Sequence, residues 1–340
     1  MRRTVLALPL ILSGCLEIDE EIDVRPDGSA DVRLVYRGDP GDFNAFLRVP
    51  GDGWNAARRT EKESTDKGPR EKWIWEFRRT FRDLNEYPVS FAPADLPDRD
   101  RYLRHATRMK ISTRGNLRVC EFEREYPRMD VREFQAVDDA ALSDPKAKEL
   151  VAKLGDKGVA GLSRDERVRL FELVVAADRE KQMLLASRAV ASFSRLQRLR
   201  SEERLAILGR MEAVTKEALS GPGLARRTEE YLARAEKEPF NFDFLKAVQK
   251  QAVAAGEEAA GRRTEPPSFR AVYESEQTAY GAGKAVGDDR FKVTLRLPGE
   301  IVAGNATRIL GDGRAQWEFE GHALYDGPVL LRAVAVEKIR

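Results

Sequence analysis

The sequence predicts an α+β protein: an antiparallel β-sheet or barrel-like domain formed by N- and C-terminal strands, with a large α-helical insertion between them. Apolar and polar side chains alternate with a period of two over residues 16–36 and again over 292–297. Between about residues 131 and 263 the period is 3.6, which is typical of amphipathic helices. We favour one β domain with an insertion over two separate β domains, because neither end has enough strands to cover its own aromatic residues.

The composition excludes several classes of protein. Of 340 residues, 42% are hydrophobic and 34% are charged, which is too polar for a polytopic membrane protein and too apolar for a disordered chain. The net charge of +2 provides no overall field that would attract nucleic acid or an acidic substrate. We therefore expect no nucleic-acid partner.

The first residues have the layout of a secretory signal. Arg2 and Arg3 form a short basic segment, and residues 4–12 are almost wholly apolar. This apolar stretch is far shorter than the roughly 20 residues of a permanent transmembrane helix. The signal ends in a tetrapeptide of small residues and a cysteine.

That tetrapeptide, Leu12-Ser13-Gly14-Cys15, resembles the lipobox of bacterial lipoproteins. The resemblance implies that residues 1–14 are removed and that the Cys15 thiol carries a lipid such as palmitate. The protein would then be anchored in the cell envelope, facing the periplasm. The alternative is an ordinary signal peptide in which Cys15 occurs by chance.

Removal of the signal leaves equal numbers of basic and acidic side chains, so the lipid rather than electrostatic attraction would hold the protein on the membrane. An aspartate directly after the acylated cysteine resembles a signal that retains lipoproteins in the inner membrane. This chain has Leu16 at that position, which favours the outer membrane. Cys120 has no intramolecular partner once Cys15 is acylated, and we expect it to pack as a small hydrophobic residue.

Residues 15–130 form the N-terminal β-rich part. Residues 16–25 and 30–36 predict a β-hairpin around the turn Pro26-Asp27-Gly28-Ser29, and Glu20 is the only polar residue on the apolar face of the first strand. Further strands are predicted at 73–77, 102–112 and 117–126, with a helical turn at 83–88.

Residues 131–265 form the predicted helical insertion. Ser163 and Glu166 have the spacing of a capping box, and Ser201 could cap a later helix. Residues 220–223 predict a break between helices. Pro266-Pro267 ends the block, and residues 266–340 are predicted to complete the sheet with strands near 292–297, 317–319 and 328–339.

The two ends of the chain resemble LppM-like bacterial lipoproteins, a group that includes domains of unknown function. The matching segments are Leu16-Glu17-Ile18-Asp19, Pro26-Asp27-Gly28-Ser29, Tyr36-Arg37-Gly38-Asp39, Leu297-Pro298-Gly299-Glu300-Ile301-Val302 with Asn305, and Ala315-Gln316-Trp317-Glu318-Phe319. The resemblance implies an α+β domain outside the cytoplasmic membrane that binds lipid or glycolipid. The helical middle has no counterpart in it.

Motifs for chemistry are scarce, and we expect no catalytic residues, metal or cofactor. No HExxH, CxxC, GxSxG or Walker A pattern occurs. His105 and His322 are expected at the surface or in packing. Asp39, Asp42 and Asp52 lie in glycine-rich loops and could hold Ca²⁺, but their spacing does not match an EF-hand loop, and aspartates commonly form turns.

Four tryptophans are the candidates for lining a ligand pocket: Trp54, Trp73, Trp75 and Trp317.

The sequence leaves three functions open. The first is a non-catalytic envelope lipoprotein that binds a lipid, a glycolipid or an envelope protein through its β domain. The second is a structural or assembly factor that docks through the helical block. The third, which we rank last, is a hydrolase of envelope polymers with carboxylates or one histidine in a cleft. A long apolar cavity would favour the first, and converging carboxylates the third.

Overall fold

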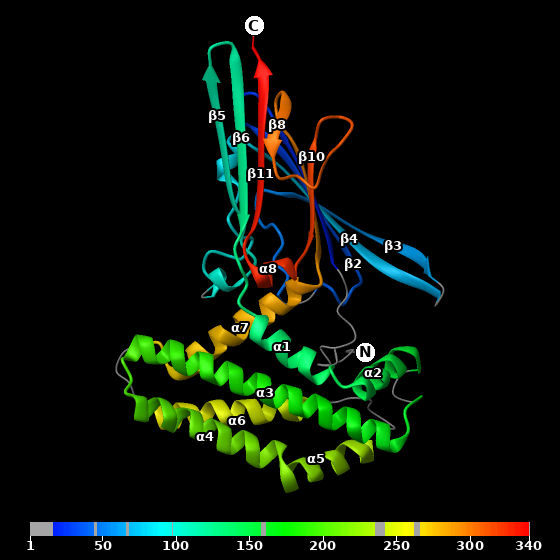
Figure 1. Cartoon of the computed structure of the whole chain (residues 1–340), viewed down its shortest axis with the longest axis vertical. Coiled ribbons are helices and arrows are strands. Elements are labelled where there is room, and N and C mark those ends of the chain that lie inside the picture. Colours follow the sequence, from blue (N-terminus) through cyan, green and yellow to red (C-terminus); the bar gives the residue numbers. More distant parts are fainter. Residues whose placement is uncertain are drawn as a thin grey trace. The chain divides into compact units, whose positions relative to one another are not determined.

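A computed structural model describes residues 16–43, 46–65, 68–96, 98–157, 161–234, 242–261 and 266–339. These residues divide into two compact units, which we call the β unit (up to Val131, and from Gly281 onward) and the helical unit (Arg132–Tyr280). The described residues contain eleven strands in two sheets and eight α-helices (Figure 1). The α+β class and the helical block between strand segments are therefore confirmed.

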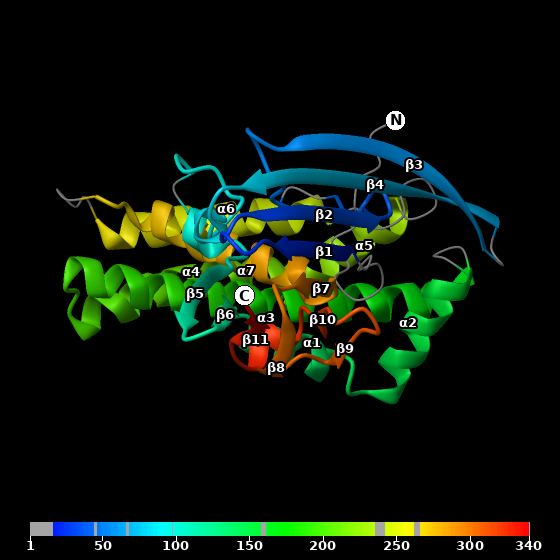
Figure 2. The same ribbon diagram turned by 90° about the horizontal axis from the view of Figure 1, so that it is seen from above.

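Sheet A has seven strands in the order β3-β4-β2-β1-β7-β10-β9, and most of this order can be followed from above in Figure 2. Its strands are β1 (Glu17–Val24), β2 (Ala30–Gly38), β3 (Asn55–Thr65), β4 (Gly68–Phe81), β7 (Arg290–Arg296), β9 (Arg308–Ile309) and β10 (Ala315–Glu320). The predicted hairpin is present as β1 and β2. Because β1 pairs with β7, sheet A unites both ends of the chain.

Sheet B has four strands in the order β5-β6-β11-β8. They are β5 (Ala106–Arg114), β6 (Leu117–Tyr126), β8 (Glu300–Gly304) and β11 (Val329–Lys338). The short elements of the β unit are the 3₁₀ turns η1 (Leu84–Glu86) and η2 (Arg99–Arg101) and the helix α8 (Ala323–Asp326). Sheet B also combines strands from both ends, since β6 pairs with β11.

The inner faces of the two sheets pack against each other. The ring of Tyr126 on β6 lies 5.2 Å from that of Phe319 on β10 and 5.9 Å from that of Phe291 on β7. Neither sheet is closed into a barrel, so the barrel-like alternative is wrong. The pairing of β1 with β7 is also parallel rather than antiparallel.

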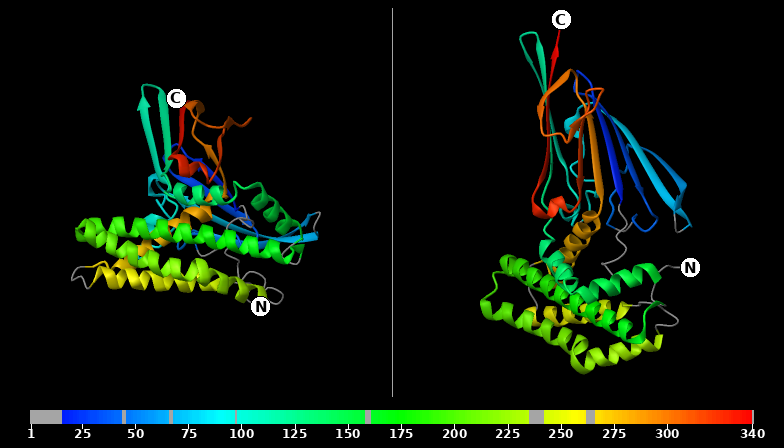
Figure 3. Two further views of the ribbon diagram at one scale, coloured as in Figure 1. Left: turned by 60° about the horizontal axis from the view of Figure 1, so that its bottom comes forward. Right: turned by 45° about the vertical axis from the view of Figure 1, so that its right-hand side comes forward.

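The helical unit contains α1 (Arg132–Ala141), α2 (Pro145–Lys157), α3 (Arg164–Gln197), α4 (Ser201–Leu219), α5 (Gly221–Arg234), α6 (Asp243–Ala260) and the first part of α7 (Phe269–Gly287). Helix α4 packs against both α3 and α6, which run side by side in the green and yellow ribbons of Figure 3. Two apolar clusters fill this unit, one around Phe193 and Phe269 and one around Phe171 and Phe242.

The predicted capping box is present at the start of α3. Ser163 N–H donates to Glu166 Oε2 at 2.7 Å, and Glu166 N–H donates to Ser163 Oγ at 3.3 Å. Ser201 is one residue out of place, because Arg200 is the N-cap of α4. The break predicted at 220–223 is confined to Ser220, whose extended backbone separates α4 from α5.

One prediction about secondary structure is wrong, and one long strand was not predicted. Pro266-Pro267 does not end the helical block, because α7 follows at Phe269 and buries Phe269, Val272 and Tyr273 at helical spacing. Strand β3 was missed because it is a charged edge strand whose described side chains are exposed, so it carries no apolar alternation.

None of the described helices combines the length and the apolar character that crossing a membrane requires.

Candidate functional site

The centre of the β unit contains a buried ion pair between Glu20 on β1 and Arg124 on β6. Glu20 is 4% exposed and Arg124 is 0% exposed. The Arg124 guanidinium donates to Glu20 Oε2 and, through Nε, to Thr107 Oγ1 at 2.8 Å. Its Cζ also lies 4.5 Å from the ring centre of Tyr87. The alternation of both strands explains this burial, since Glu20 and Arg124 occupy inward-facing positions between apolar neighbours.

His105 lies beside this pair in a cage of aromatic rings. Its ring centre is 5.2 Å from that of Tyr87, 5.0 Å from Phe91 and 6.0 Å from Tyr126. Burial, reinforced by the positive charge of Arg124, lowers the pKa of His105 to about 4. His105 is therefore neutral at pH 7, and its ring can accept a hydrogen bond.

Several buried polar atoms of this cluster lack a well-formed hydrogen bond within the described residues. They are Glu20 Oε1, Tyr87 Oη, His105 Nδ1 and Arg124 Nη2. The Tyr87 hydroxyl is close to the Glu20 carboxylate, which adds to burial in raising the pKa of Tyr87 well above its usual value. Unsatisfied buried polar atoms cost about 1–3 kcal/mol each, so such a group at one place is a candidate for function.

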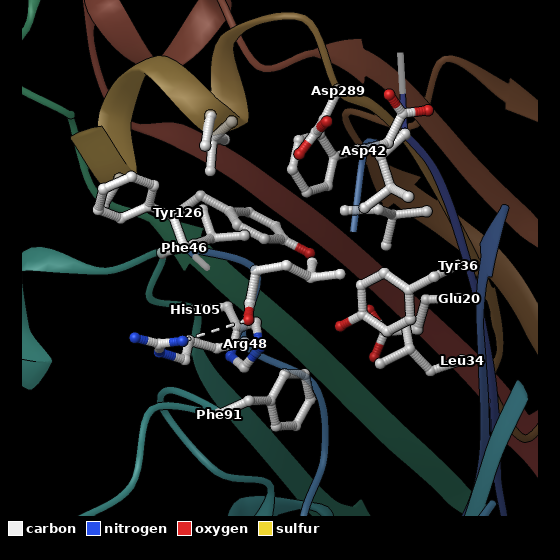
Figure 4. A pocket seen from close by; sticks show the side chains of 18 of the residues that line it. Glu20, Leu34, Tyr36, Asp42, Phe46, Arg48, Phe91, His105, Tyr126 and Asp289 are labelled. Atoms are coloured by element: carbon white, nitrogen blue, oxygen red, sulfur yellow. Dashed lines mark hydrogen bonds between the residues drawn. The ribbon is translucent and has the colours of Figure 1, made fainter. Parts of the chain in front are cut away.

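A cavity of about 50 Å³ borders the cluster. Apolar side chains from β1, β2, the loop after β2 and the end of α7 form most of its wall, among them Leu16, Leu34, Phe46 and Val286. Its polar lining is drawn in Figure 4, with Glu20 and Tyr36 on one side and His105 below. The volume is about a third of the roughly 150 Å³ of an engineered cavity that binds benzene. It accommodates a small group and not a whole acyl chain.

Two carboxyl groups, Asp42 and Asp289, lie at another end of the cavity, away from His105 (Figure 4). Burial raises the pKa of both groups, and the neighbouring Asp42 raises that of Asp289 further. Asp289 also accepts a hydrogen bond from the backbone N–H of Leu16, which holds the start of β1.

None of the four tryptophans is among the residues that line this cavity. Trp54 packs against Phe81, Tyr87 and Phe91. Trp317 is 3% exposed, and its Nε1–H donates to Asn305 Oδ1 at 3.0 Å. Trp73 and Trp75 stack on each other, with ring centres 6.3 Å apart, and remain partly exposed.

The other predicted residues are placed as follows. Leu12, Ser13, Gly14 and Cys15 lie outside the described residues. Cys120 is fully buried on β6 and burial raises its pKa, as expected of a packing residue. His322 is partly exposed, with Nε2 3.6 Å from Asp288 Oδ1.

The described residues include no group of three or more His, Cys, Asp or Glu side chains placed to hold a metal ion. Sequence reasoning also missed the Glu20–Arg124 pair. The sequence did indicate one member of the pair, because Glu20 interrupts an otherwise apolar strand face. It did not indicate Arg124 as the partner, because Arg124 is distant in sequence.

Comparisons with known proteins give little further information. No protein-family profile and no curated protein matches the chain. Among solved structures, the NMR structure of the folded domain of LppM from Mycobacterium tuberculosis matches 98% of this chain and 95% of its own, with 10% sequence identity and a TM-score of 0.27. With so low a TM-score, the match carries no information on ligand or activity.

Proposed function

We propose that the protein is a lipid-anchored lipoprotein of the bacterial cell envelope whose β unit is a non-catalytic binding module for a lipid or glycolipid. The N-terminal signal ending in Cys15 supports the anchor. One observation supports the binding role: an apolar cavity whose wall contains buried polar atoms without well-formed hydrogen bonds.

The polar atoms indicate which end of such a ligand enters the cavity. In the cavity wall, Glu20 Oε1 and the neutral His105 ring are acceptors, and the Tyr87 hydroxyl can donate or accept, so they suit a group that both donates and accepts hydrogen bonds. Arg124 neutralises the charge of Glu20, so the site does not require a charged ligand. A single hydroxyl-bearing arm of an uncharged headgroup, such as one hydroxymethyl group of glycerol or of a sugar, fits both the chemistry and the volume of about 50 Å³.

The anchor is tested by replacing Cys15 with serine in the full chain. The variant should leave the membrane fraction, and the mass of the N-terminal peptide should lose its acyl groups. Unchanged membrane retention would refute acylation of Cys15.

Ligand binding is tested with three probes that share one tail: octyl glucoside, octyl sulfate and octylammonium. We expect the uncharged glucoside to bind, and His105→Phe to abolish its binding by filling the cavity and removing an acceptor. The matched control is His322→Phe, since His322 does not line the cavity. Equal binding by both variants would contradict this role for the cavity. Mass spectrometry of lipids that co-purify with the full-length protein would identify the natural ligand.

A second function, docking on another envelope protein through the helical unit, is supported by a surface groove of about 540 Å³. The groove lies along α1, α3 and α4, and its apolar residues are Val137, Met183 and Leu184. If this groove holds a partner, Met183→Glu should dissociate an envelope complex in native electrophoresis and leave octyl glucoside binding intact. If the Met183→Glu variant migrates in the same complexes as the unaltered protein, the groove does not have this role.

A further inference from the structure

The described part of the β unit begins at Leu16, the residue that follows the proposed lipid anchor. The N–H of Leu16 donates to Asp289, and its carbonyl accepts from the N–H of Arg290 at 2.8 Å. Its side chain is 1% exposed and forms part of the cavity wall. Both backbone groups of Leu16 are therefore fixed by the segment that begins β7.

Cys15 directly precedes Leu16, so an acyl group on Cys15 would be joined to this fixed residue by a single peptide unit. The headgroup layer of each leaflet is only about 5–8 Å thick. With so short a tether, the end of sheet A that contains Leu16 has to lie at the level of the headgroups. This step rests on the proposed lipid anchor.

Strand register identifies which other residues share that end of sheet A. Leu16 lies next to Gly38, because a Cβ on Gly38 would be 3.0 Å from Leu16 Cδ1. Gly38 in turn pairs with Trp73 on β4. Leu16, Gly38 and Trp73 therefore form one row across three adjacent strands, β1, β2 and β4.

Aromatic side chains gather at this row and remain partly accessible. The ring of Phe43 lies 5.6 Å from that of Trp73 and 4.6 Å from that of Trp75. Phe46, in the same loop as Phe43, is 36% exposed and lines the cavity. Half-exposed tryptophans of this kind are enriched where proteins meet the bilayer interface.

Charge contributes little to this end of the sheet. Arg37 Nη1 lies 3.5 Å from Glu17 Oε2, and the side chains of Arg70 and Lys72 both form ion pairs with the Asp39 carboxylate. Because each of these three cations has a carboxylate beside it, their attraction to anionic lipid is weak, and apolar contact has to account for most of the interaction. The guanidinium of Arg58 also reaches this end, where its Cζ lies 4.2 Å from the ring centre of Trp75.

We propose that the edge formed by Phe43, Phe46, Trp73 and Trp75 beside the backbone of Leu16, the membrane edge, lies against the bilayer that holds the anchor. Phe46 belongs to this edge and, like the buried Leu16 beside it, lines the cavity. The cavity therefore adjoins the membrane edge.

Tryptophan quenching tests this placement. The acylated full chain is incorporated into vesicles of phosphatidylethanolamine and phosphatidylglycerol in which some acyl chains carry bromine, a contact quencher. One variant, Trp54→Phe with Trp317→Phe, keeps only the two tryptophans of the membrane edge. Its counterpart, Trp73→Phe with Trp75→Phe, keeps only the other two. We expect loss of emission in the first variant, unchanged by high salt, and none in the second. Equal quenching of both, or of neither, would overturn the proposal.

A flexible insert distinguishes contact of the membrane edge with the bilayer from lipid anchoring. A Gly/Ser insert of about 15 residues between Cys15 and Leu16, with a root-mean-square length of roughly 20 Å, should abolish the quenching while the protein stays in the membrane fraction. The same insert between Gly115 and Asn116, at the exposed β5–β6 turn, should leave quenching unchanged. Membrane retention without quenching in the protein lacking any insert would refute the membrane edge alone. Failure to attach at all would refute the lipid anchor.

Discussion

Glu20 and Arg124 form an ion pair that joins sheet A to sheet B in the interior of the β unit. Removing two charges from water is costly, and a buried pair repays that cost only with good geometry and further hydrogen bonds. Here Thr107 supplies one of those bonds. The pair therefore contributes more to fixing how the two sheets face each other than to net stability.

Breaking this pair should be costly, and removing it entirely should not. Arg124→Met leaves the Glu20 carboxylate buried without a counter-ion, which we expect to lower the free energy of unfolding by about 3–5 kcal/mol. The double variant Glu20→Leu with Arg124→Met should recover most of that loss. Urea denaturation of the single and double variants measures both effects. The control is Arg308→Met at the exposed Arg308–Glu318 pair, which should cost less than about 1 kcal/mol. A double variant as unstable as the single one would contradict this expectation.

Stability should fall as the pH drops from about 6.5 to about 4, because of His105. The folded protein holds the pKa of His105 at about 4, while the unfolded chain takes up the proton near 6.5. The unfolded state thus binds more protons in this window, and stability is lost on acidification by up to roughly 3 kcal/mol. His105→Phe should flatten the curve of unfolding free energy against pH, and His322→Phe should not. Parallel curves for His105→Phe and the unaltered protein would argue against a buried neutral histidine.

The two serines near helix starts should differ in their effect. Ser163→Ala removes the cap of α3 and should cost about 1 kcal/mol, whereas Ser201→Ala at the first residue of α4 should change stability little. Thermal unfolding followed by helical circular dichroism compares the two variants. Equal losses would mean that the capping box has no special role.

The β unit should fold without residues 132–280. A short Gly/Ser bridge can join Val131 to Gly281, since Val131 already contacts α7: a Cβ on Gly283 would lie 2.4 Å from Val131 Cγ1. We expect the shortened protein to keep its strand signal in circular dichroism and its octyl glucoside binding. Loss of the strand signal would show that the sheets depend on the helical unit.

Local patterns predicted the elements that have a clean period. The β1–β2 hairpin follows from strict alternation around Pro26-Asp27-Gly28-Ser29, and the start of α3 from the spacing of Ser163 and Glu166. Helix α7 was missed because Pro266-Pro267 suggested an end, although proline is tolerated just before a helix starts.

The candidate site could be predicted only in part. Glu20 was recognisable as a polar residue on an apolar strand face, but its partner Arg124 lies on another sheet. The histidine cage depends on Tyr87, Phe91 and Tyr126, which come from separate segments. Such convergence is set by how the sheets pack, and no local period records it.

The pairing of Glu17 with Arg290, and of Tyr126 with Val329, has a consequence for how the chain reaches its final state. Each sheet pairs residues that are more than 200 positions apart, so a polypeptide that has emerged only as far as its helical segment can complete neither. Until then, the edges of the N-terminal strands keep unpaired backbone hydrogen-bonding groups. Contacts between residues so distant in sequence also make folding slow. Termination before Ala315 would leave both sheets unfinished, because β10 of sheet A and β11 of sheet B would be missing.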